Sequence, residues 1–336
     1  MSLSQFMEKR TSFNPFVIFM TLLFVSSLVA VTLLMPEQTQ TFLNVAKNAI
    51  FAHFSWFYIL AFSIFLCFLV ILSVSNLGNI KLGQDEDMPE FSFISWLAML
   101  FAAGMGVGLM FFGVAEPLSH YPSSITTGGA EHKQQEALLH TVFHWGIHAW
   151  AVYGTIALAL AYFGFRYKLP LALRSCFYPL LKERINGKLG DAIDIMALLS
   201  TLFGIITTLG YGAAQLGAGL AQLGWISENN FGLQIAIIVV VMGLAIFSAI
   251  SGVGKGVKIL SELNLGLAFT LLLFVLVTGP TLYLLSAFSD NIGNYLSNIL
   301  QLSFKTYAYE QENTDWFSGW TILYWAWWCS WAPFVG

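Results

Sequence analysis

Charged residues are scarce in this sequence. Lys, Arg, Asp and Glu together make up 10% of its 336 residues, whereas a soluble globular domain carries about a quarter. Hydrophobic residues make up 57%, aromatic residues 16%, and the mean hydropathy is +0.73. This composition excludes an ordinary soluble domain and predicts an integral membrane protein in a lipid bilayer. The net charge of −4 adds little, and a nucleic-acid partner is not expected.

Cysteine is scarce as well. The three cysteines, Cys67, Cys176 and Cys329, are too few and too scattered for a disulfide framework or a zinc site. Two of them lie in apolar runs, where a buried thiol is expected. A cleavable signal peptide is not expected, because the first apolar run is long and its pattern is that of an uncleaved segment.

Long apolar runs, by contrast, are abundant. A membrane span needs about 20 apolar residues, and the chain offers eight candidates. The expected spans lie at approximately 14–35, 53–76, 91–115, 137–164, 190–222, 233–252, 263–288 and 319–336.

Two further stretches are amphipathic. Residues 168–186 mix apolar residues with four Lys or Arg, which predicts a helix lying on the membrane surface. Residues 291–305 predict a shorter amphipathic piece on the opposite side. The N-terminus is expected in the cytoplasm, because eleven of the 14 Lys and Arg residues then fall on the inside.

The third expected span carries three glycines at every second position, Gly104, Gly106 and Gly108. Gly104 and Gly108 alone would form a small-xxx-small helix-packing motif. Gly106 points away from them on a helix, which favours a backbone requirement instead. Three glycines, at about 1 kcal/mol each relative to alanine, make this turn easy to unwind. Discontinuous helices of this kind build substrate and ion sites in secondary transporters.

Aromatic side chains cluster on single faces of two spans. In the fourth span, Trp145, Trp150 and Tyr153 fall within an arc of about 140°. In the last span a second group falls within about 100° of one another, while Trp325 lies off that face. The second group consists of Tyr324, Trp327, Trp328 and Trp331.

An interfacial aromatic belt is the alternative explanation, and Trp316 and Trp320 fit it. It explains the deeper rings less well. Rings that converge inside a membrane suggest a cation without hydrogen-bond donors, as in the recognition of quaternary ammonium groups. A carboxylate on the same ligand could meet N–H groups of the unwound glycine turn. No expected span carries an obvious acidic counter-ion, since Asp191 and Asp194 lie at the mouth of the fifth. This inventory fits a zwitterion.

Three stretches, GMGVGLMFFGVAEP, FHWGIHAWAVY and WTILYWAWWCSWAPFVG, resemble signature stretches of the betaine/choline/carnitine transporter family. The resemblance implies an all-α integral membrane protein of the LeuT type, with two peripheral helices and two inverted repeats of five. On that template, 1–88 holds the N-terminal tail and the peripheral helices, and 89–290 the first repeat. Residues 291–336 hold the amphipathic segment and the first helix of the second repeat. The sequence is therefore expected to be a fragment of a longer transporter.

The resemblance also implies a function. The protein is expected to import a quaternary ammonium osmolyte, first of all glycine betaine, across the inner (plasma) membrane by alternating access. A choline or carnitine transporter, or an exchanger, is the alternative within the family. A homo-oligomer, a trimer, is implied as well. No cofactor is expected, and the coupling ion would be sodium or a proton.

The family's site residues transfer onto this sequence position by position. The aromatic box corresponds to Trp145, Trp150, Tyr153 and Trp328, and the permeation path to Trp327 and Trp331. An aspartate at the position of Gly108 is associated with choline in the family, so the glycine favours glycine betaine. The unwound stretch of the substrate site corresponds to Gly104, Met105, Gly106 and Gly108.

Sodium-coupled relatives use backbone carbonyls at the positions of Ala102 and Met105 and two threonine hydroxyls. Thr201 matches the first threonine, and Phe334 joins the implied ion site. Ile205 occupies the second threonine position, and its side chain cannot coordinate sodium.

Three histidines recur every four residues in the fourth span, at His140, His144 and His148. Ionisable residues inside a membrane are functional candidates. A metal site is not expected beyond a sodium ion, because no carboxylate or cysteine joins them in the sequence. A proton-linked role for His144 or His148 stays open.

Other classes of function fit less well. A channel needs a continuous polar lining, and the spans offer few such residues. A structural membrane subunit would not need both a glycine turn and converging aromatic rings. An enzyme is not expected, because no nucleophile–base pair is evident.

Overall fold

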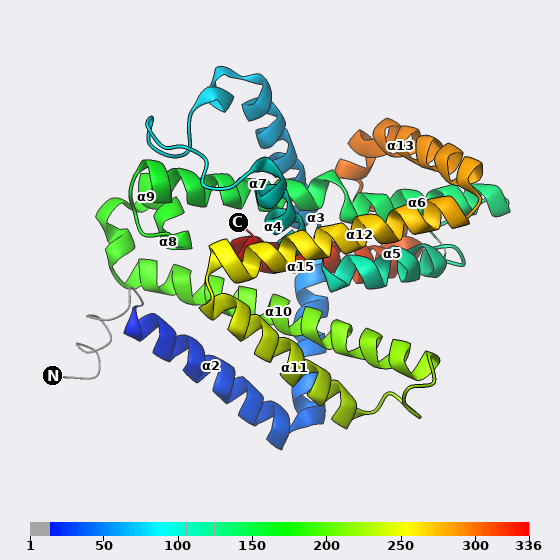
Figure 1. Ribbon diagram of the computed structural model, residues 1–336, viewed down its shortest axis with the longest axis horizontal. Coiled ribbons are helices and arrows are strands. Elements are labelled where there is room, and N and C mark those ends of the chain that lie inside the picture. Colours follow the sequence, from blue (N-terminus) through cyan, green and yellow to red (C-terminus); the bar gives the residue numbers. More distant parts are fainter. Residues whose placement is uncertain (1–13, 105, 124, 336) are drawn as a thin grey trace.

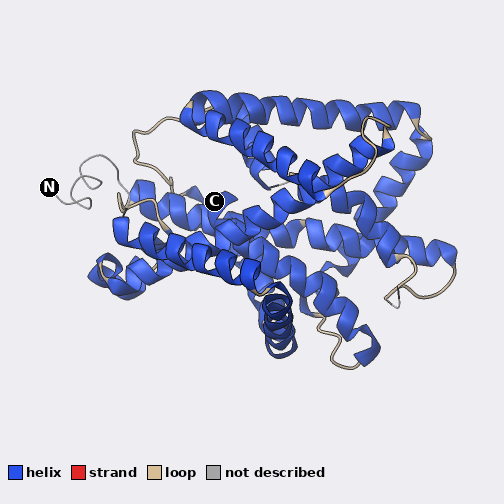
Figure 2. Cartoon of the chain, turned by 90° about the horizontal axis from the view of Figure 1, so that it is seen from below, coloured by secondary structure: helices blue, strands red, loops and turns tan. Residues whose placement is uncertain are grey.

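The computed structural model describes residues 14–104, 106–123 and 125–335. The described residues form helices and loops only, with no strand among them (Figures 1 and 2). The all-α expectation is therefore confirmed. The α-helices are α2 (Pro15–Leu34), α3 (Pro36–Val74), α4 (Phe93–Gly104), α5 (Val107–His120), α6 (Ala130–Trp145), α7 (Ile147–Ala161), α8 (Leu173–Cys176), α9 (Tyr178–Leu181), α10 (Lys188–Gln222), α11 (Phe231–Ile250), α12 (Lys258–Thr278), α13 (Thr281–Phe304), α14 (Thr314–Phe317) and α15 (Leu323–Val335).

Short turns extend several of these helices. Three are π-helical, a form that often marks functional sites, and three are 3₁₀ turns. The π-helical turns are Tyr162–Arg166 after α7, Val253–Val257 before α12 and Ser318–Ile322 before α15. The 3₁₀ turns are Asn76–Asn79, Lys182–Asn186 and Gln311–Asn313.

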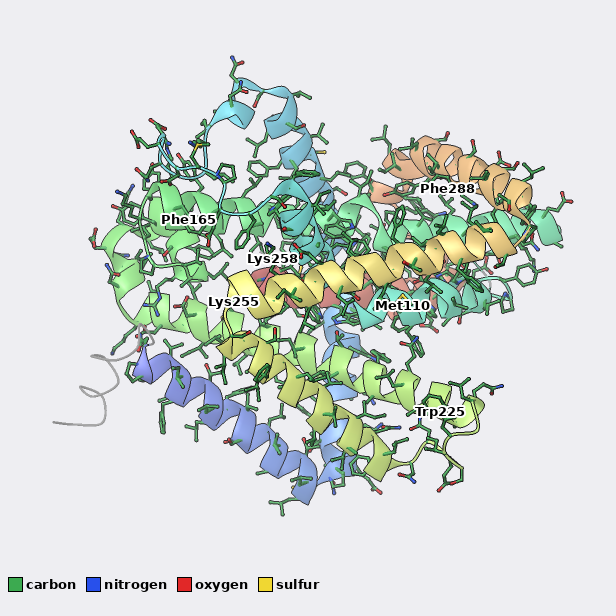
Figure 3. The ribbon with its side chains drawn as sticks, in the orientation of Figure 1. Met110, Phe165, Trp225, Lys255, Lys258 and Phe288 are labelled. Carbon is green, nitrogen blue, oxygen red and sulfur yellow. The ribbon has the colours of Figure 1, made fainter. Side chains whose placement is uncertain are left out.

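Membrane-spanning helices dominate the described part of the chain. Six are long and apolar enough to cross a bilayer, or seven if α4 and α5 form one broken span. Large apolar side chains face outward, as a lipid-facing surface requires. Phe165, Trp225 and Phe288, which Figure 3 labels, are for example 56%, 75% and 65% exposed.

The eighth expected span, 319–336, is not among these helices. It is helical as far as Val335, through the π-helical turn 318–322 and α15. Its tryptophans and Tyr324 are less apolar than aliphatic residues, which is why it differs from the other spans. It is also a buried element, because Tyr324, Trp325 and Trp328 are at most 3% exposed.

The expected boundaries of two segments, 263–288 and 291–305, were wrong. The expected span 263–288 crosses Gly279 and Pro280, but α12 ends at Thr278 and α13 begins at Thr281. Proline cannot donate the hydrogen bond that would continue a helix, so the chain turns here. The expected amphipathic piece 291–305 is consequently the second half of the continuous helix α13.

A single surface helix was expected over residues 168–186, but the structure does not form one there. It consists of α8, α9 and the 3₁₀ turn 182–186. Arg174 holds it against the start of α10, with guanidinium contacts of 3.0 Å to Asp191 and 2.5 Å to Asp194. The Asn14 amide also donates to Asp191, over 2.7 Å, and its carbonyl oxygen caps α2. The two aspartates are thus structural partners at this end of α10.

Helix α15 lies near the middle of the molecule (Figure 1). It packs against α10 and α7, and also touches α4 and α3. Because these neighbours come from distant parts of the chain, α15 gathers them around its own aromatic side chains. Trp325 points toward α3, where its ring stacks on Phe62 at 4.6 Å between ring centroids. The expectation that Trp325 lies off the common aromatic face is confirmed.

Two helices are interrupted beside α15. Between α4 and α5, Gly106 has φ −94° and ψ −133°, outside the helical region, and the two halves differ in direction by 58°. The predicted interruption at the glycine turn is confirmed. The second interruption, at Gly146 between α6 and α7, was not predicted from the sequence. Gly146 has φ −89° and ψ −144°, and the next N–H, that of Ile147, donates to the Tyr295 hydroxyl over 3.1 Å.

Gly146→Ala is expected to destabilise the protein. An added Cβ would fall against the Val142 carbonyl oxygen and 2.9 Å from the Tyr295 hydroxyl. Such overpacking costs about 1–3 kcal/mol. We expect a lower midpoint of thermal unfolding in detergent. Gly243→Ala on α11 is the matched control, since a Cβ there meets nothing within 4 Å. Equal midpoints for both variants would contradict the close packing at Gly146.

Candidate functional site

A cavity of about 570 Å³ lies where the interrupted helix α4–α5 meets α15. Helices α7, α10, α11 and α12 complete its walls. Its lining is mostly apolar and aromatic, as in sites for small organic ligands. The lining residues used below are Ala102, Gly106, Gly108, Trp145, Tyr153, Trp327, Trp328, Trp331 and Phe334.

The rings around this cavity meet at different angles. Trp327 and Trp328 stack on each other, with 5.3 Å between centroids and an interplanar angle of 7°. Trp145 meets Trp328 edge to face at 4.8 Å, and Tyr153 meets it in the same way at 6.1 Å. Ring faces from α6, α7 and α15 therefore border one space, as the aromatic arcs predicted.

The structure places most, though not all, of the predicted substrate residues at the cavity. Gly106, Gly108 and the four rings Trp145, Tyr153, Trp327 and Trp328 line it, together with Trp331. Trp150 is half-buried and is absent from the lining in the described part of the chain; its ring packs on Tyr153 at 5.9 Å. Gly104 ends α4, and Met105 lies outside the described residues.

The predicted ion residues are less well gathered. Ala102 and Phe334 line the cavity, whereas half-buried Thr201 and Ile205 are not among its described lining residues. Thr208, two turns after Thr201 on α10, lines the cavity instead. The arrangement brings together only part of the predicted sodium site.

No obvious acidic counter-ion was expected in any span, but α5 carries a buried carboxylate. Glu116 lies within α5, which continues through Pro117 to His120, and its side chain is fully buried. The sequence reading ended this span at residue 115 and so left Glu116 outside it.

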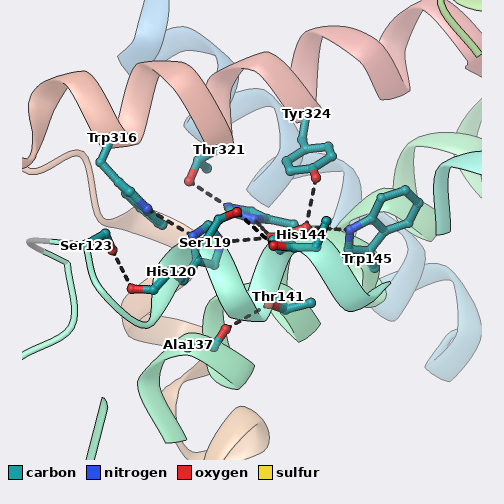
Figure 4. A network of polar contacts seen from close by, with 12 residues as sticks. Ser119, His120, Ser123, Ala137, Thr141, His144, Trp145, Trp316, Thr321 and Tyr324 are labelled. Atoms are coloured by element: carbon teal, nitrogen blue, oxygen red, sulfur yellow. Dashed lines mark hydrogen bonds and ion pairs between the residues drawn. The ribbon is translucent and has the colours of Figure 1, made fainter. Parts of the chain in front are cut away.

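Glu116 accepts four hydrogen bonds, from the partners His120, His144, Trp145 and Tyr324 that Figure 4 labels. One carboxylate oxygen, Oε1, accepts from His120 Nε2 over 3.0 Å and from His144 Nδ1. The other, Oε2, accepts from the Trp145 indole and from the Tyr324 hydroxyl, each over 2.8 Å. Because each oxygen already serves two donors, this carboxylate is held within the protein and is not offered to the cavity.

The three histidines of the fourth span occupy different surroundings. His144 is fully buried and joins Glu116 and, through Nε2, the Thr321 hydroxyl at 2.9 Å. His148 Nε2 lies 2.8 Å from the Ser303 hydroxyl of α13. His140 packs its ring on Trp316 at 4.9 Å. The statement that no carboxylate joins these histidines is therefore wrong for His144.

Glu116, His120 and His144 lie close enough together to suggest a metal site. The hydrogen bond on the far side of His120 argues against one. The Trp316 indole N–H donates to His120 Nδ1 over 3.2 Å, so Nδ1 carries a lone pair. A neutral histidine that binds a metal through Nε2 must carry its proton on Nδ1. The indole, which can only donate, excludes that tautomer.

Trp316 and Trp320, the two rings that fit an interfacial belt, both pack on His120. Trp316 is 9% exposed and packs between His120, His140 and Tyr307. Trp320 is half-buried and lies 4.7 Å from the His120 ring. Both rings therefore pack within the protein.

The sequence did contain a signal for the buried cluster around Glu116. The spacing Glu116–His120 places a carboxylate and an imidazole one helical turn apart.

Comparison with known proteins identifies similar sequences along almost the whole chain. A family model described as betaine/carnitine/choline family transporter matches residues 16–336. An uncharacterized transporter of Haemophilus influenzae is 81% identical over 330 residues, 98% of this chain and 49% of that protein. A glycine betaine transporter of Acinetobacter baylyi is 45% identical over 325 residues, 96% of this chain and 49% of that protein.

The glycine betaine transporter OpuD of Bacillus subtilis is 46% identical over 303 residues, 90% of this chain and 59% of that protein. The chain thus spans about half the length of the first two of these relatives.

Proposed function

We propose, from the premise that the chain belongs to the betaine/carnitine/choline transporter family, that the full-length protein imports glycine betaine. The observation that carries this proposal is the aromatic cavity beside the interrupted helix α4–α5. The trimethylammonium group would lie against the rings of Trp145, Trp327 and Trp328. Desolvated contacts between a cation and aromatic ring faces contribute about 2 kcal/mol or more.

The glycine turn would receive the carboxylate of the substrate. Gly106 and Gly108 line the cavity, and α5 begins between them at Val107. The first N–H groups of a helix lack partners within it and favour anions. Among the described residues, no side chain caps the start of α5. The Glu116 carboxylate is occupied by its four donors and does not act as a counter-ion for a bound substrate. A zwitterion, which carries its own negative charge, is therefore favoured over a cation.

The proposal extends to the whole transport cycle. We place 89–290 in a first inverted repeat and 319–336 in the first helix of a second, so that the cavity lies at their interface. Movement of one repeat against the other would expose it alternately to the two sides. The alternative functions are choline or carnitine transport and substrate exchange. The coupling ion would be sodium or a proton. Ala102, Met105, Thr201 and Phe334 are the proposed ion ligands.

The proposed setting is the inner (plasma) membrane, with the N-terminus in the cytoplasm. The distribution of Lys and Arg among the loops supports this orientation. A homo-oligomer, a trimer, is part of the same proposal and rests on the family resemblance alone.

Trp328→Leu is expected to weaken glycine betaine binding at least tenfold, because it removes the ring that Trp145 and Tyr153 both meet. A tenfold loss corresponds to about 1.4 kcal/mol. Binding of labelled glycine betaine to the purified full-length protein measures the effect. Trp328→Phe keeps a ring face but loses the indole hydrogen bond to the His144 carbonyl oxygen, so it should bind more tightly than Trp328→Leu.

Trp225→Leu serves as the control, since Trp225 is 75% exposed in the loop after α10. Unchanged affinity in a folded Trp328→Leu protein would remove the cation–π argument.

Gly108→Asp is expected to shift the preference from glycine betaine toward choline. A Cβ at this position lies 3.0 Å from Trp145 and 3.3 Å from Trp327, so the new carboxylate would enter the aromatic cavity. It would repel a substrate carboxylate and attract a net cation. Gly108→Asn is the matched control, because it has nearly the same shape without the charge.

The measurement is the ratio of choline to glycine betaine uptake by cells that carry each full-length variant. We expect a ratio at least tenfold higher for Gly108→Asp than for Gly108→Asn. The same ratio in both variants would show that the substrate carboxylate does not lie near residue 108.

A further inference from the structure

Glu116 carries a buried negative charge that the proposed transport function does not use. Its side chain has no exposure, and its two oxygens accept two hydrogen bonds each. Each oxygen faces a group that can only donate, Oε1 the His120 Nε2–H and Oε2 the Trp145 indole N–H. The arrangement therefore fits the carboxylate ion, whose two oxygens can accept all four bonds.

An unpaired charge in such a place is costly, so a buried carboxylate needs a positive partner. His120 cannot supply it. Its Nδ1 atom accepts the Trp316 indole N–H over 3.2 Å, which leaves Nε2 to donate to Glu116. His120 is thereby fixed as a neutral imidazole, with its one proton on Nε2.

His144 can supply the positive charge. Its Nδ1 atom donates to Glu116, and its Nε2 atom lies 2.9 Å from the Thr321 hydroxyl. A hydroxyl can either donate or accept, so Nε2 can hold a lone pair or a proton without losing its partner. His144 is fully buried, and its Nδ1 atom lies against the Glu116 carboxylate.

The other groups around His144 are aromatic rings, the neutral His120 and the Glu116 carboxylate, so His144 is the group that can bind an additional proton. From α5 it faces Glu116 and His120, and from α15 the ring of Tyr324, 5.0 Å away between centroids. Trp316 and Trp325 also pack on its ring. His140 lies one turn earlier on its own helix, and Lys305, after α13, pairs with Glu310 at 3.1 Å.

We propose that Glu116 and His144 form a proton-binding site that positions the aromatic cavity. One proton resides on His144 Nε2, is donated to Thr321, and neutralises the Glu116 carboxylate. The carboxylate in turn holds Trp145 and Tyr324. The His144 backbone oxygen accepts the Trp328 indole N–H over 3.0 Å.

The position of the aromatic residues in the cavity thereby depends on the protonation of His144. Thr321 lies in the π-helical turn 318–322 that leads into α15, so the proton on His144 joins α6 to the helix that carries Trp327 and Trp328. Glu116 and His144 are positioning residues, because neither lines the cavity among the described residues.

The first test needs no substrate. In ¹⁵N NMR spectra of the full-length protein in lipid at pH 7, we expect both ring nitrogens of His144 to carry protons. His120 should carry one proton, on Nε2, as an internal comparison in the same spectrum. In Glu116→Gln, His144 should be neutral. A neutral His144 in the unaltered protein, or an unchanged imidazolium in Glu116→Gln, would overturn the proton site.

The second test rests on the proposed function and measures glycine betaine affinity. We expect at least a tenfold loss in Glu116→Gln, because an amide cannot accept from all four donors, and partial recovery in Glu116→Asp. Tyr324→Phe removes only the hydroxyl donor and is expected to weaken binding about threefold. It provides a milder variant if Glu116→Gln does not fold. Glu131→Gln, at an exposed position of α6, should bind as the unaltered protein does.

The two tests fail separately. If the unaltered protein does not bind glycine betaine, the proposed function is wrong, while the NMR result still decides the proton site. If His144 is charged but both Glu116→Gln and Tyr324→Phe bind glycine betaine with full affinity, the positioning role is overturned.

Discussion

The buried carboxylate of Glu116 is the interaction on which the rest of the site depends. It bonds to the side chains of Trp145 and Tyr324, which come from α6 and α15 and are far apart in the chain. A charge-assisted hydrogen bond is roughly twice as strong as a neutral one. Such bonds gain further strength where water is excluded. The Glu116 side chain thus fixes the position of Trp145 relative to Tyr324. Its negative charge must be neutralised by a nearby positive charge if it is to stay buried.

The two helix interruptions make room for this arrangement. At Gly106 the backbone leaves the helical region and opens the start of α5 toward the cavity. At Gly146 the break directly follows Trp145, and a side chain at this position would meet the Val142 carbonyl and Tyr295. Irregular backbone inside a membrane is tolerated only where it lines a cavity or is buried in protein. Both breaks satisfy that condition, and both border the same group of rings.

The sequence predicted those features that follow from local pattern. Apolar runs located most spans, the glycine spacing located the first interruption, and helical periodicity separated Trp325 from the ring faces of Trp327 and Trp328. It missed Glu116 because the acid sits before a proline at the edge of an apolar run. Its partners His144 and Tyr324 are 28 and 208 residues away. The break at Gly146 was missed because one glycine is tolerated in a helix, and only its contact with Tyr295 shows why it is needed.

The central claim is that aromatic faces in this cavity hold a cation without N–H donors. The most direct test compares the binding of glycine betaine and N,N-dimethylglycine to the purified full-length protein at pH 7. Both ligands are zwitterions, but dimethylglycine carries an N–H that the ring faces cannot satisfy as water does. The account predicts at least tenfold tighter binding of glycine betaine, about 1.4 kcal/mol. Equal affinities, or tighter binding of dimethylglycine, would contradict it.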